Sequence, residues 1–417
     1  MYSGGEKFFE GSSVSTDQTR VIGVGVISLG WMGNLHARSY RAALDHFPDE
    51  SVDVRMVAAA DASLDAALRA QAVHGFEKVT ADYRDVLADP DVDVVSICAP
   101  NYLHHEVALA AAAAGKPFWI EKPMGVSIGQ SEEIARAAAR AGVVTAVGFN
   151  YRNAPTLVRA KSLIASGALG LITNVTVRLL ADYSSDPTGA FTWRFEKARA
   201  GSGVLGDLLS HGFDLGHYLV GRIGEVCAET STFITERPRP SQDAVSHFSA
   251  GTGPLAAVEN EDHAAVLARF ENGAVGVFES SRTAVGPRAE YTIEVYGTAG
   301  SIRWDFQRLN EFQVCVGRGS SPYGYTTVYA EPGDGDFGRF QPGGGVAMGF
   351  DDLKTIEAHL FLTSVLSGEQ LAPSVADGWA AAAVVDASER SVATRAWATV
   401  AVVDGVTTYQ RPVAEAH

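Results

Sequence analysis

The chain has 417 residues, of which 46% are hydrophobic and 20% charged, a composition that supports two well-buried cores. Its formal net charge of −16 argues against nucleic-acid binding, because such proteins need a clustered basic surface to displace counterions. Cys98, Cys227 and Cys315 are too few and too scattered for a disulfide framework or a zinc site, so we expect a reducing, cytoplasmic compartment and no metal.

The N-terminus and the apolar stretches give no sign of targeting or of a membrane anchor. Residues 1–19 lack a basic start followed by an apolar run, so we expect a disordered leader and not a secretory signal. The longest apolar stretch, Val107 to Ala114, falls far short of the ~20 residues needed to cross a bilayer. We therefore expect a protein without a membrane span.

Residues 20–150 alternate short β-branched runs with alanine-rich helical segments. This rhythm is typical of βαβ units and predicts an α/β Rossmann domain with a parallel sheet. One predicted helix, Glu106 to Ala114, ends at Gly115. The predicted strands are Val21–Ile27, Val54–Ala60, Val92–Ile97, Pro117–Ile120 and Val143–Val147.

Residues 151–417 are predicted to form a second domain, of the α+β class, on a largely antiparallel open sheet. Turn signals at Asn272-Gly273 and at Gly297–Gly300 separate strand-like runs between Ala264 and Asp305. The other predicted elements are a helix over Pro155–Ser166, a strand over Ile172–Leu180, a glycine-rich loop over Gly317–Gly349 and helices over about Asp351–Leu366 and Ser374–Ala393.

The first predicted strand runs into a turn where a Rossmann fold holds the pyrophosphate of a dinucleotide. The backbone N–H groups and the helix N-terminus must come close to the phosphates there, which requires glycines. Ser28 stands in place of the first fingerprint glycine, so that the pattern alone is explained equally well by a tight turn without ligand. The predicted cofactor turn comprises Ser28, Leu29, Gly30, Trp31, Met32 and Gly33.

Asp61 lies at the carboxyl end of the next predicted strand, where a carboxylate can accept hydrogen bonds from both ribose hydroxyls. A helix N-cap would also explain this residue, and the two roles are compatible. Ala62 and Ser63 follow instead of an arginine, so a 2′-phosphate would meet no obvious cation. The sequence therefore predicts NAD as the cofactor and disfavours NADP.

Further motifs follow in a definite order: Ala99-Pro100-Asn101-x-x-His104, Glu121-Lys122-Pro123, Gly148-Phe149-Asn150-Tyr151-Arg152, Gly201-Ser202-Gly203 and Asp207-x-x-x-His211-x-x-Asp214. With them the chain resembles the glucose/fructose oxidoreductase and inositol dehydrogenase (Gfo/Idh/MocA) family of NAD(P)-dependent oxidoreductases. The departures, Ser28 and Ser202, remove no side chain that does chemistry. Beyond the turn and Asp61, the resemblance implies cofactor contacts from Ala99, Pro100, Asn101, His104, Glu121, Lys122 and Asn150.

Lys122 follows a predicted strand at the sheet edge where ligands of open α/β folds bind. The proline after it restricts its backbone to an extended, or even a cis, arrangement. A lone lysine in such a loop is more commonly a solvated charge. The resemblance implies instead an ammonium that touches the substrate hydroxyl and the nicotinamide region.

Asp207, His211 and Asp214 fall at i, i+4 and i+7, so they would share one face of a single helix. An aspartate one turn away can orient an imidazole and support its cationic form. In isolation this pattern is more often a capping aspartate with a surface histidine, and the family context favours catalysis. His217 is off this face and is expected to be structural.

The combined prediction is an NAD-dependent dehydrogenase of a sugar, cyclitol or anhydrosugar. His211, tuned by Asp207, takes the proton of a secondary hydroxyl, hydride passes to the nicotinamide C4, and Lys122 stabilises the charge on oxygen. NAD-dependent glycoside cleavage through transient oxidation and a non-catalytic dinucleotide sensor remain alternatives, although a sensor has no need of all three residues. The candidate substrate-binding residues are Tyr151, Arg152, Trp193, Arg194 and Asp214, with packing against the sheet an equal alternative for Trp193.

We also expect a homodimer or homotetramer. The strands of the second domain carry apolar residues such as Val275, Val277, Ile293 and Val295, and an open sheet face would otherwise expose a large apolar patch. The loops Asp182–Ala190 and Gly317–Gly349 are expected to set the selectivity for the substrate.

Overall fold

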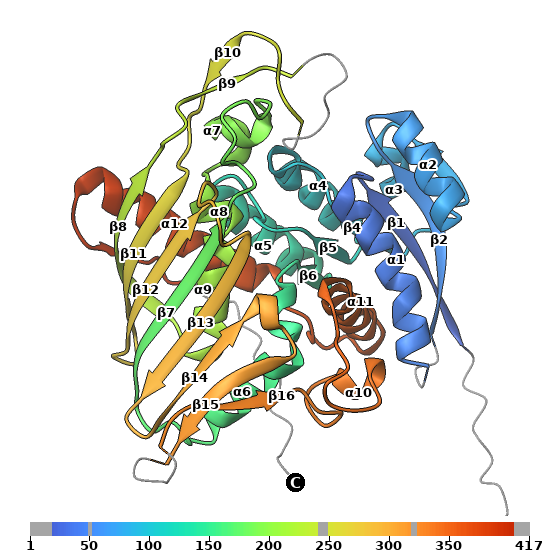
Figure 1. Cartoon of the computed structure of the whole chain (residues 1–417). Coiled ribbons are helices and arrows are strands. Elements are labelled where there is room, and N and C mark those ends of the chain that lie inside the picture. The colour runs from blue at the N-terminus through green and yellow to red at the C-terminus, as the bar shows by residue number, and fades with distance from the viewer. Residues whose placement is uncertain (1–18, 49–51, 241–248, 318–322, 404–417) are drawn as a thin grey trace, which may run out of the picture.

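The computed structural model describes residues 19–48, 52–240, 249–317 and 323–403, so all but the last residue of the predicted leader lies outside the described residues. Two sheets dominate the fold, the smaller at the right and the larger at the left of Figure 1, with helices between them. None of the described helices combines the length and the apolar character needed to cross a bilayer.

The N-terminal sheet is the predicted Rossmann sheet. Its six strands are parallel in the order β3-β2-β1-β4-β5-β6. The short strand β3 was not predicted, and α4 begins at Asn101, five residues before the predicted start. The elements are β1 (Arg20–Ile27), α1 (Trp31–His46), β2 (Val52–Ala60), α2 (Leu64–His74), β3 (Lys78–Thr80), α3 (Tyr83–Ala88), β4 (Val94–Ile97), α4 (Asn101–Ala113), β5 (Phe118–Ile120), α5 (Ile128–Ala141) and β6 (Thr145–Val147).

The second sheet has nine strands in the order β16-β15-β14-β13-β7-β12-β11-β8-β17. Among the described strands of this sheet, only β7 and β12 pair in parallel, which confirms the prediction of a largely antiparallel sheet. A separate ribbon of β9 and β10 projects at the top of Figure 1. The strands are β7 (Ile172–Ala181), β8 (Ile223–Ser231), β9 (Glu236–Pro238), β10 (Leu255–Ala257), β11 (His263–Phe270), β12 (Val275–Ser281), β13 (Ala289–Gly297), β14 (Gly300–Asp305), β15 (Glu311–Val316), β16 (Thr326–Tyr329) and β17 (Ala398–Thr399).

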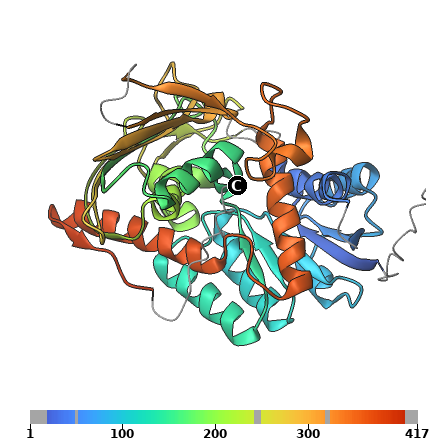
Figure 2. The same cartoon turned by 90° about the horizontal axis from the view of Figure 1, so that it is seen from below.

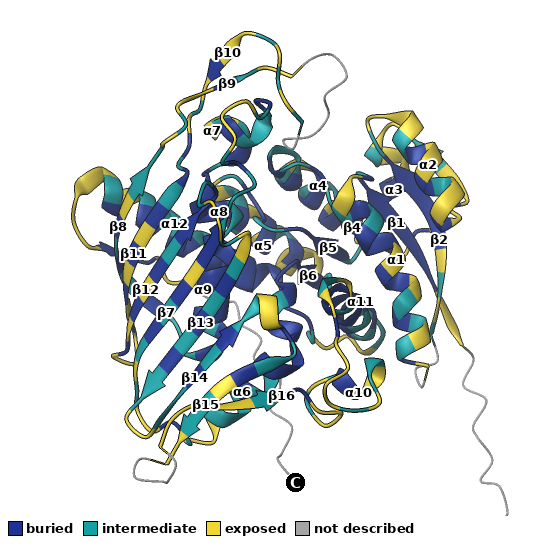
Figure 3. Ribbon diagram, in the orientation of Figure 1, coloured by how far each residue is buried: buried dark blue, intermediate teal, exposed yellow. Residues whose placement is uncertain are grey.

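Buried and exposed residues alternate along strands of the large sheet such as β11 (Figure 3), as the period of a strand requires. Helix α9 (Leu209–Leu219) lies on the covered face, where the rings of Phe213 and Phe278 are 5.1 Å apart. Ile293 and Val295 also point into this core, so the expectation that they form an exposed interface was wrong. Val275 and Val277 lie on the open face and are about half exposed.

The two C-terminal helices, α11 (Phe350–Ser367) and α12 (Val375–Thr394), both pack against the N-terminal domain, and α12 also packs against β8 of the second sheet (Figure 2). Ile356 of α11 shares a hydrophobic core with Val24 of β1, and Trp379 of α12 shares another with Ile120 of β5. Residues beyond the predicted division at residue 150 therefore also contribute to the cores of the N-terminal domain.

The remaining helices connect the strands and position the site described next. They are η1 (Asn150–Asn153), α6 (Pro155–Ala165), η2 (Trp193–Phe195), α7 (Lys197–Ala200), α8 (Val204–Asp207), η3 (Phe306–Arg308) and α10 (Phe337–Phe340).

Candidate active site

The turn after β1 has the backbone geometry of a phosphate-binding turn. Ser28 has a φ of +71°, in the left-handed region that a fingerprint glycine would adopt without strain. A Cβ on Gly33 would lie 1.9 Å from the Ser28 carbonyl oxygen, so only glycine fits there. Gly30 is the N-cap of α1, and a Cβ on it would meet nothing within 4 Å. The helix N-terminus thus faces open space, which fits a pyrophosphate.

Asp61 ties this turn to the end of β2. Its carboxylate accepts hydrogen bonds from the Leu29 amide at 2.7 Å and the Ser63 amide at 2.8 Å. It therefore lies beside the turn, where a ribose-binding carboxylate belongs, and also stabilises the start of α2. Trp31, the first residue of α1, is 69% exposed and its ring stacks on Phe350 of α11 at 5.8 Å.

Lys122 and Asp207 meet between the two domains. The Lys122 ammonium, just beyond β5, donates to the Asp207 carbonyl oxygen at 2.7 Å and to its Oδ1 at 3.3 Å. The bond between Lys122 and Pro123 is cis. The Tyr183 hydroxyl donates to Asp207 Oδ2 at 2.8 Å, and Arg194 Nη1 lies 3.3 Å from Oδ1. The Asp207 carboxylate therefore accepts hydrogen bonds from two cationic side chains and one phenol.

These neighbours keep Asp207 ionised. Burial alone would favour the neutral acid, but the charges of Lys122 and Arg194 and the hydrogen bond from Tyr183 hold the pKa of Asp207 well below its usual range. The carboxylate can therefore hold the Lys122 ammonium in place at any physiological pH. Tyr183 was not among the predicted site residues, although its loop, Asp182–Ala190, was expected to set selectivity.

His211 lies on α9 and is 8% exposed. Its ring packs edge-on against Tyr151, with centroids 4.7 Å apart. Burial, and then the charge of Lys122, lower the pKa of His211 well below 6.5. The imidazole is therefore neutral at physiological pH and can accept a proton.

The expected alignment of Asp207 with His211 was wrong. The chain breaks at Leu208 between α8 and α9, so that Asp207 and His211 do not lie in one helix. The Asp207 carboxylate is instead bound by Lys122, Tyr183 and Arg194. Asp207 therefore contacts Lys122 directly, and it acts on His211 through its charge, which favours the imidazolium form.

Comparison with known proteins identifies the family. Residues 22–149 match the model of an oxidoreductase family with an NAD-binding Rossmann fold, and residues 157–303 match the GFO/IDH/MocA C-terminal domain. The chain is 38% identical over 380 residues to the levoglucosan dehydrogenase of Pseudarthrobacter phenanthrenivorans, covering 90% of this chain and 97% of the relative. The chain belongs to the Gfo/Idh/MocA family.

Two further comparisons agree with this assignment. A solved structure of levoglucosan dehydrogenase in complex with NADH and levoglucosan superposes with a TM-score of 0.85 at 36% identity, covering 91% of this chain and 100% of that chain. The myo-inositol 2-dehydrogenase of Thermotoga maritima is 26% identical over 88% of this chain and 96% of its own length. This Gfo/Idh/MocA protein is thus an oxidoreductase with an NAD-binding Rossmann domain.

Arg152 and Asp214 are not among the residues that line the cavity beside Asp207 in this Gfo/Idh/MocA protein. Both are buried, and Arg152 donates two hydrogen bonds to the Asp214 carboxylate and one, of 2.9 Å, to Asp377 Oδ1 on α12. These charged groups bind one another inside the core, which favours a structural role over the predicted contact with the sugar. They join η1, α9 and α12.

Three of the predicted cofactor residues of this oxidoreductase form hydrogen bonds within the protein. The two ring nitrogens of His104 lie 2.8 Å from the Pro123 carbonyl oxygen and 2.7 Å from the Ala99 carbonyl oxygen. Burial lowers the pKa of His104. A neutral ring can donate a hydrogen bond to only one of the two oxygens. Asn101 donates to the Ala200 carbonyl oxygen at 3.0 Å. Glu121 is 7% exposed and points into the interior, contrary to the predicted cofactor contact.

Four further predicted residues lie beside the small cavity next to Asp207, at the start of α4 or buried in η1. Trp193 and Arg194 form η2, with the Arg194 guanidinium 4.7 Å from the Trp193 ring centroid. They line a small cavity together with Tyr183 and Asp207. Pro100 is the N-cap of α4, and the Asn150 amide nitrogen is buried with no described partner.

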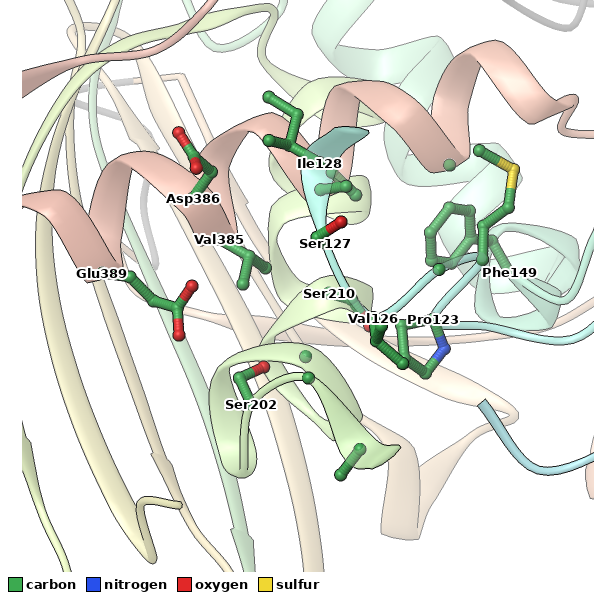
Figure 4. A pocket seen from close by; sticks show the side chains of 18 residues that line it. Pro123, Val126, Ser127, Ile128, Phe149, Ser202, Ser210, Val385, Asp386 and Glu389 are labelled. Carbon is green, nitrogen blue, oxygen red and sulfur yellow. The ribbon is translucent and has the colours of Figure 1, made fainter. Parts of the chain in front are cut away.

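A second cavity, of about 70 Å³, shares Ala200 and Ser202 with the cavity beside Asp207 (Figure 4). Pro123, Gly206 and Ser210 line it, and each is the neighbour in sequence of one of the three predicted catalytic residues. The Ser210 hydroxyl is buried without a described partner. Helix α12 closes the far side, with Asp386 and Glu389 in Figure 4.

Proposed function

We propose that this protein oxidises a secondary hydroxyl of a sugar, cyclitol or anhydrosugar with NAD as the acceptor, and that an anhydrosugar is the preferred substrate. The observation that carries the proposal is a neutral, buried His211 in the field of a Lys122 ammonium that Asp207 holds in place. The similarity to levoglucosan dehydrogenase over nearly the whole chain supports the substrate class.

His211, Lys122 and Asp207 have different roles in the proposed reaction. His211, neutral at physiological pH, accepts the hydroxyl proton. The ammonium of Lys122 stabilises the negative charge that develops on the oxygen, and Asp207 holds that ammonium by its carbonyl and carboxylate oxygens. The turn from Ser28 to Gly33 and Asp61 would hold NAD, whose nicotinamide would accept the hydride when bound.

We assign substrate recognition to the residues that line the small cavity beside Asp207. The Trp193 ring offers a flat apolar face to a sugar ring, and Arg194 offers hydrogen-bond donors. These groups suit the hydroxyls of an uncharged sugar. The formal net charge of −16 disfavours the approach of a strongly anionic substrate.

A screen of sugars, inositols and anhydrosugars for NADH formation, with NADP in parallel, tests this proposal. We expect NAD to be reduced, with the highest kcat/KM on an anhydrosugar such as levoglucosan. The proposal is contradicted if the purified protein binds NAD and yet reduces it with none of these compounds.

A further inference from the structure

Four ionisable side chains meet in the interior behind the catalytic lysine. They are His36 on α1, Glu121 at the end of β5, and Lys354 and Glu357 on α11, each at most 7% exposed. The Lys354 ammonium donates to Glu121 Oε1 at 2.5 Å and to Glu357 Oε2 at 2.7 Å. His36 Nε2 lies 3.0 Å from Glu121 Oε1, and its Nδ1 lies 3.1 Å from Ser96 Oγ.

The geometry leaves Glu121 little freedom. A Cβ on Gly148 would lie 2.6 Å from Glu121 Oε1, so the carboxylate passes directly over that glycine. The His36 ring stacks on Trp119 at 3.4 Å, and Lys354 Nζ lies 5.3 Å from the same Trp119 ring centroid. The residue that precedes Lys122 is thereby fixed to α11 and α1.

The charges in the cluster are paired. Burial opposes the charge on Lys354, but Glu121 and Glu357 raise its pKa above the usual value. Burial likewise opposes ionisation of Glu121, but Lys354 and His36 hold its pKa below the usual range. Burial lowers the pKa of His36 to about 4 and raises that of Glu357 to about 8. The cluster therefore holds the Lys354 ammonium between two carboxyl groups, of which Glu121 is the one held ionised.

We propose that Lys354 is a positioning residue for catalysis, holding Glu121 and hence the adjacent Lys122, and placing a fixed positive charge behind His211. This inference rests on the proposed function. Lys354 lies outside both stretches matched by the family models, residues 22–149 and 157–303. The C-terminal helix α11 thus supplies a part of the site that the Rossmann domain alone lacks.

The positive charge of Lys354 should affect the pH dependence of the reaction, because it acts on the pKa of His211. Lys354 disfavours the imidazolium form of His211, and Glu121 favours it. The titratable groups that face His211 are Lys122 and Glu121 at the end of β5, Lys354 on α11, Asp207 on α8, Tyr151 on η1 and Tyr291 on β13. Removing Lys354 alone therefore raises the pKa of His211.

The test compares Lys354→Met with Lys354→Arg, which keeps the charge. We expect Lys354→Met to lower kcat by about 10- to 100-fold, the effect of misplacing a catalytic group, and to move the acid limb of kcat/KM upward by about 0.5 pH unit. We expect smaller changes in kcat and in the acid limb for Lys354→Arg than for Lys354→Met. Lys161→Met, a matched change at a half-buried lysine on α6, leaves kcat and the limb unchanged.

A double variant covers the case in which Lys354→Met fails to fold, since that change leaves a buried carboxylate unpaired. Glu121→Gln/Lys354→Met removes both charges. We expect its acid limb to return toward the wild-type position while kcat stays low. A double variant with wild-type kcat overturns the proposal.

A measurement without substrate separates this inference from the proposed function. The rate at which an amine-reactive reagent labels Lys122, followed by peptide mass spectrometry, reports how firmly that ammonium is held. We expect faster labelling of Lys122 in Lys354→Met and in the double variant than in the wild type. An unchanged labelling rate overturns the positioning role of Lys354, whichever substrate the enzyme uses.

Discussion

The Lys122 ammonium donates to both the carbonyl oxygen and the carboxylate of Asp207, at 2.7 and 3.3 Å. Lys122 follows a strand of the Rossmann sheet and Asp207 ends a short helix of the second domain. The contact therefore fixes the two domains at the point where the chemistry is proposed. It also shows that Asp207 binds the lysine directly and acts on His211 only through its charge.

Tyr183→Phe removes one of the hydrogen bonds that hold the Asp207 carboxylate. A hydrogen bond to a charged group contributes about 1.5–3 kcal/mol, so we expect kcat/KM for the sugar to fall by at least about tenfold while the Kd for NAD is unchanged. Tyr329→Phe, at an exposed tyrosine on β16, serves as the control. Equal losses in both variants would contradict the assignment of Tyr183.

The cofactor preference follows from Asp61. We expect tighter binding of NAD than of NADP, because a carboxylate accepts ribose hydroxyls and repels a 2′-phosphate. Asp61→Ala should weaken NAD binding, also because the Leu29 amide loses its partner. Asp53→Ala, at the exposed opposite end of β2, should leave it unchanged. Fluorescence titration measures all three, and equal or tighter binding of NADP would disprove this assignment.

Arg152 should matter for folding and not for sugar binding. Breaking a buried ion pair by removing one partner costs about 3–5 kcal/mol, and Arg152→Met leaves both Asp214 and Asp377 unpaired. We expect the free energy of unfolding to fall by about that amount, with little change in the KM for the sugar of the folded protein. A raised KM at unchanged stability, measured by denaturant unfolding, would restore the substrate-binding role.

The open face of the large sheet is proposed as a subunit interface. Leu267, Val275 and Val277 are 49%, 51% and 44% exposed there, and paired sheets would cover them. We expect light scattering to find a dimer or a tetramer at micromolar concentration. Val277→Lys should shift the mass toward the monomer, whereas Val285→Lys, in an exposed loop, should not. A wild-type monomer would rule the interface out.

The Rossmann strands and the turn after β1 could be predicted because local pattern determines them: β-branched runs buried on both faces, and glycines where the backbone turns tightly. The break between α8 and α9 could not, since nothing in the residues around Leu208 marks it. The pairing of Arg152 with Asp377 and of Glu121 with Lys354 joins residues more than two hundred positions apart. Tertiary packing alone brings such partners together, so local periodicity carries no signal for them.

The measurement that tests the central claim most directly is the pH dependence of kcat/KM for the wild type and His211→Ala on a confirmed substrate. Burial and the charge of Lys122 lower the pKa of His211, so the wild-type rate should rise with pH along a limb that lies below pH 6.5. His211→Ala should lose about 10²-fold or more in turnover, lose that limb, and still bind NAD. Near-normal turnover in His211→Ala, with the limb retained, would show that another group is the base.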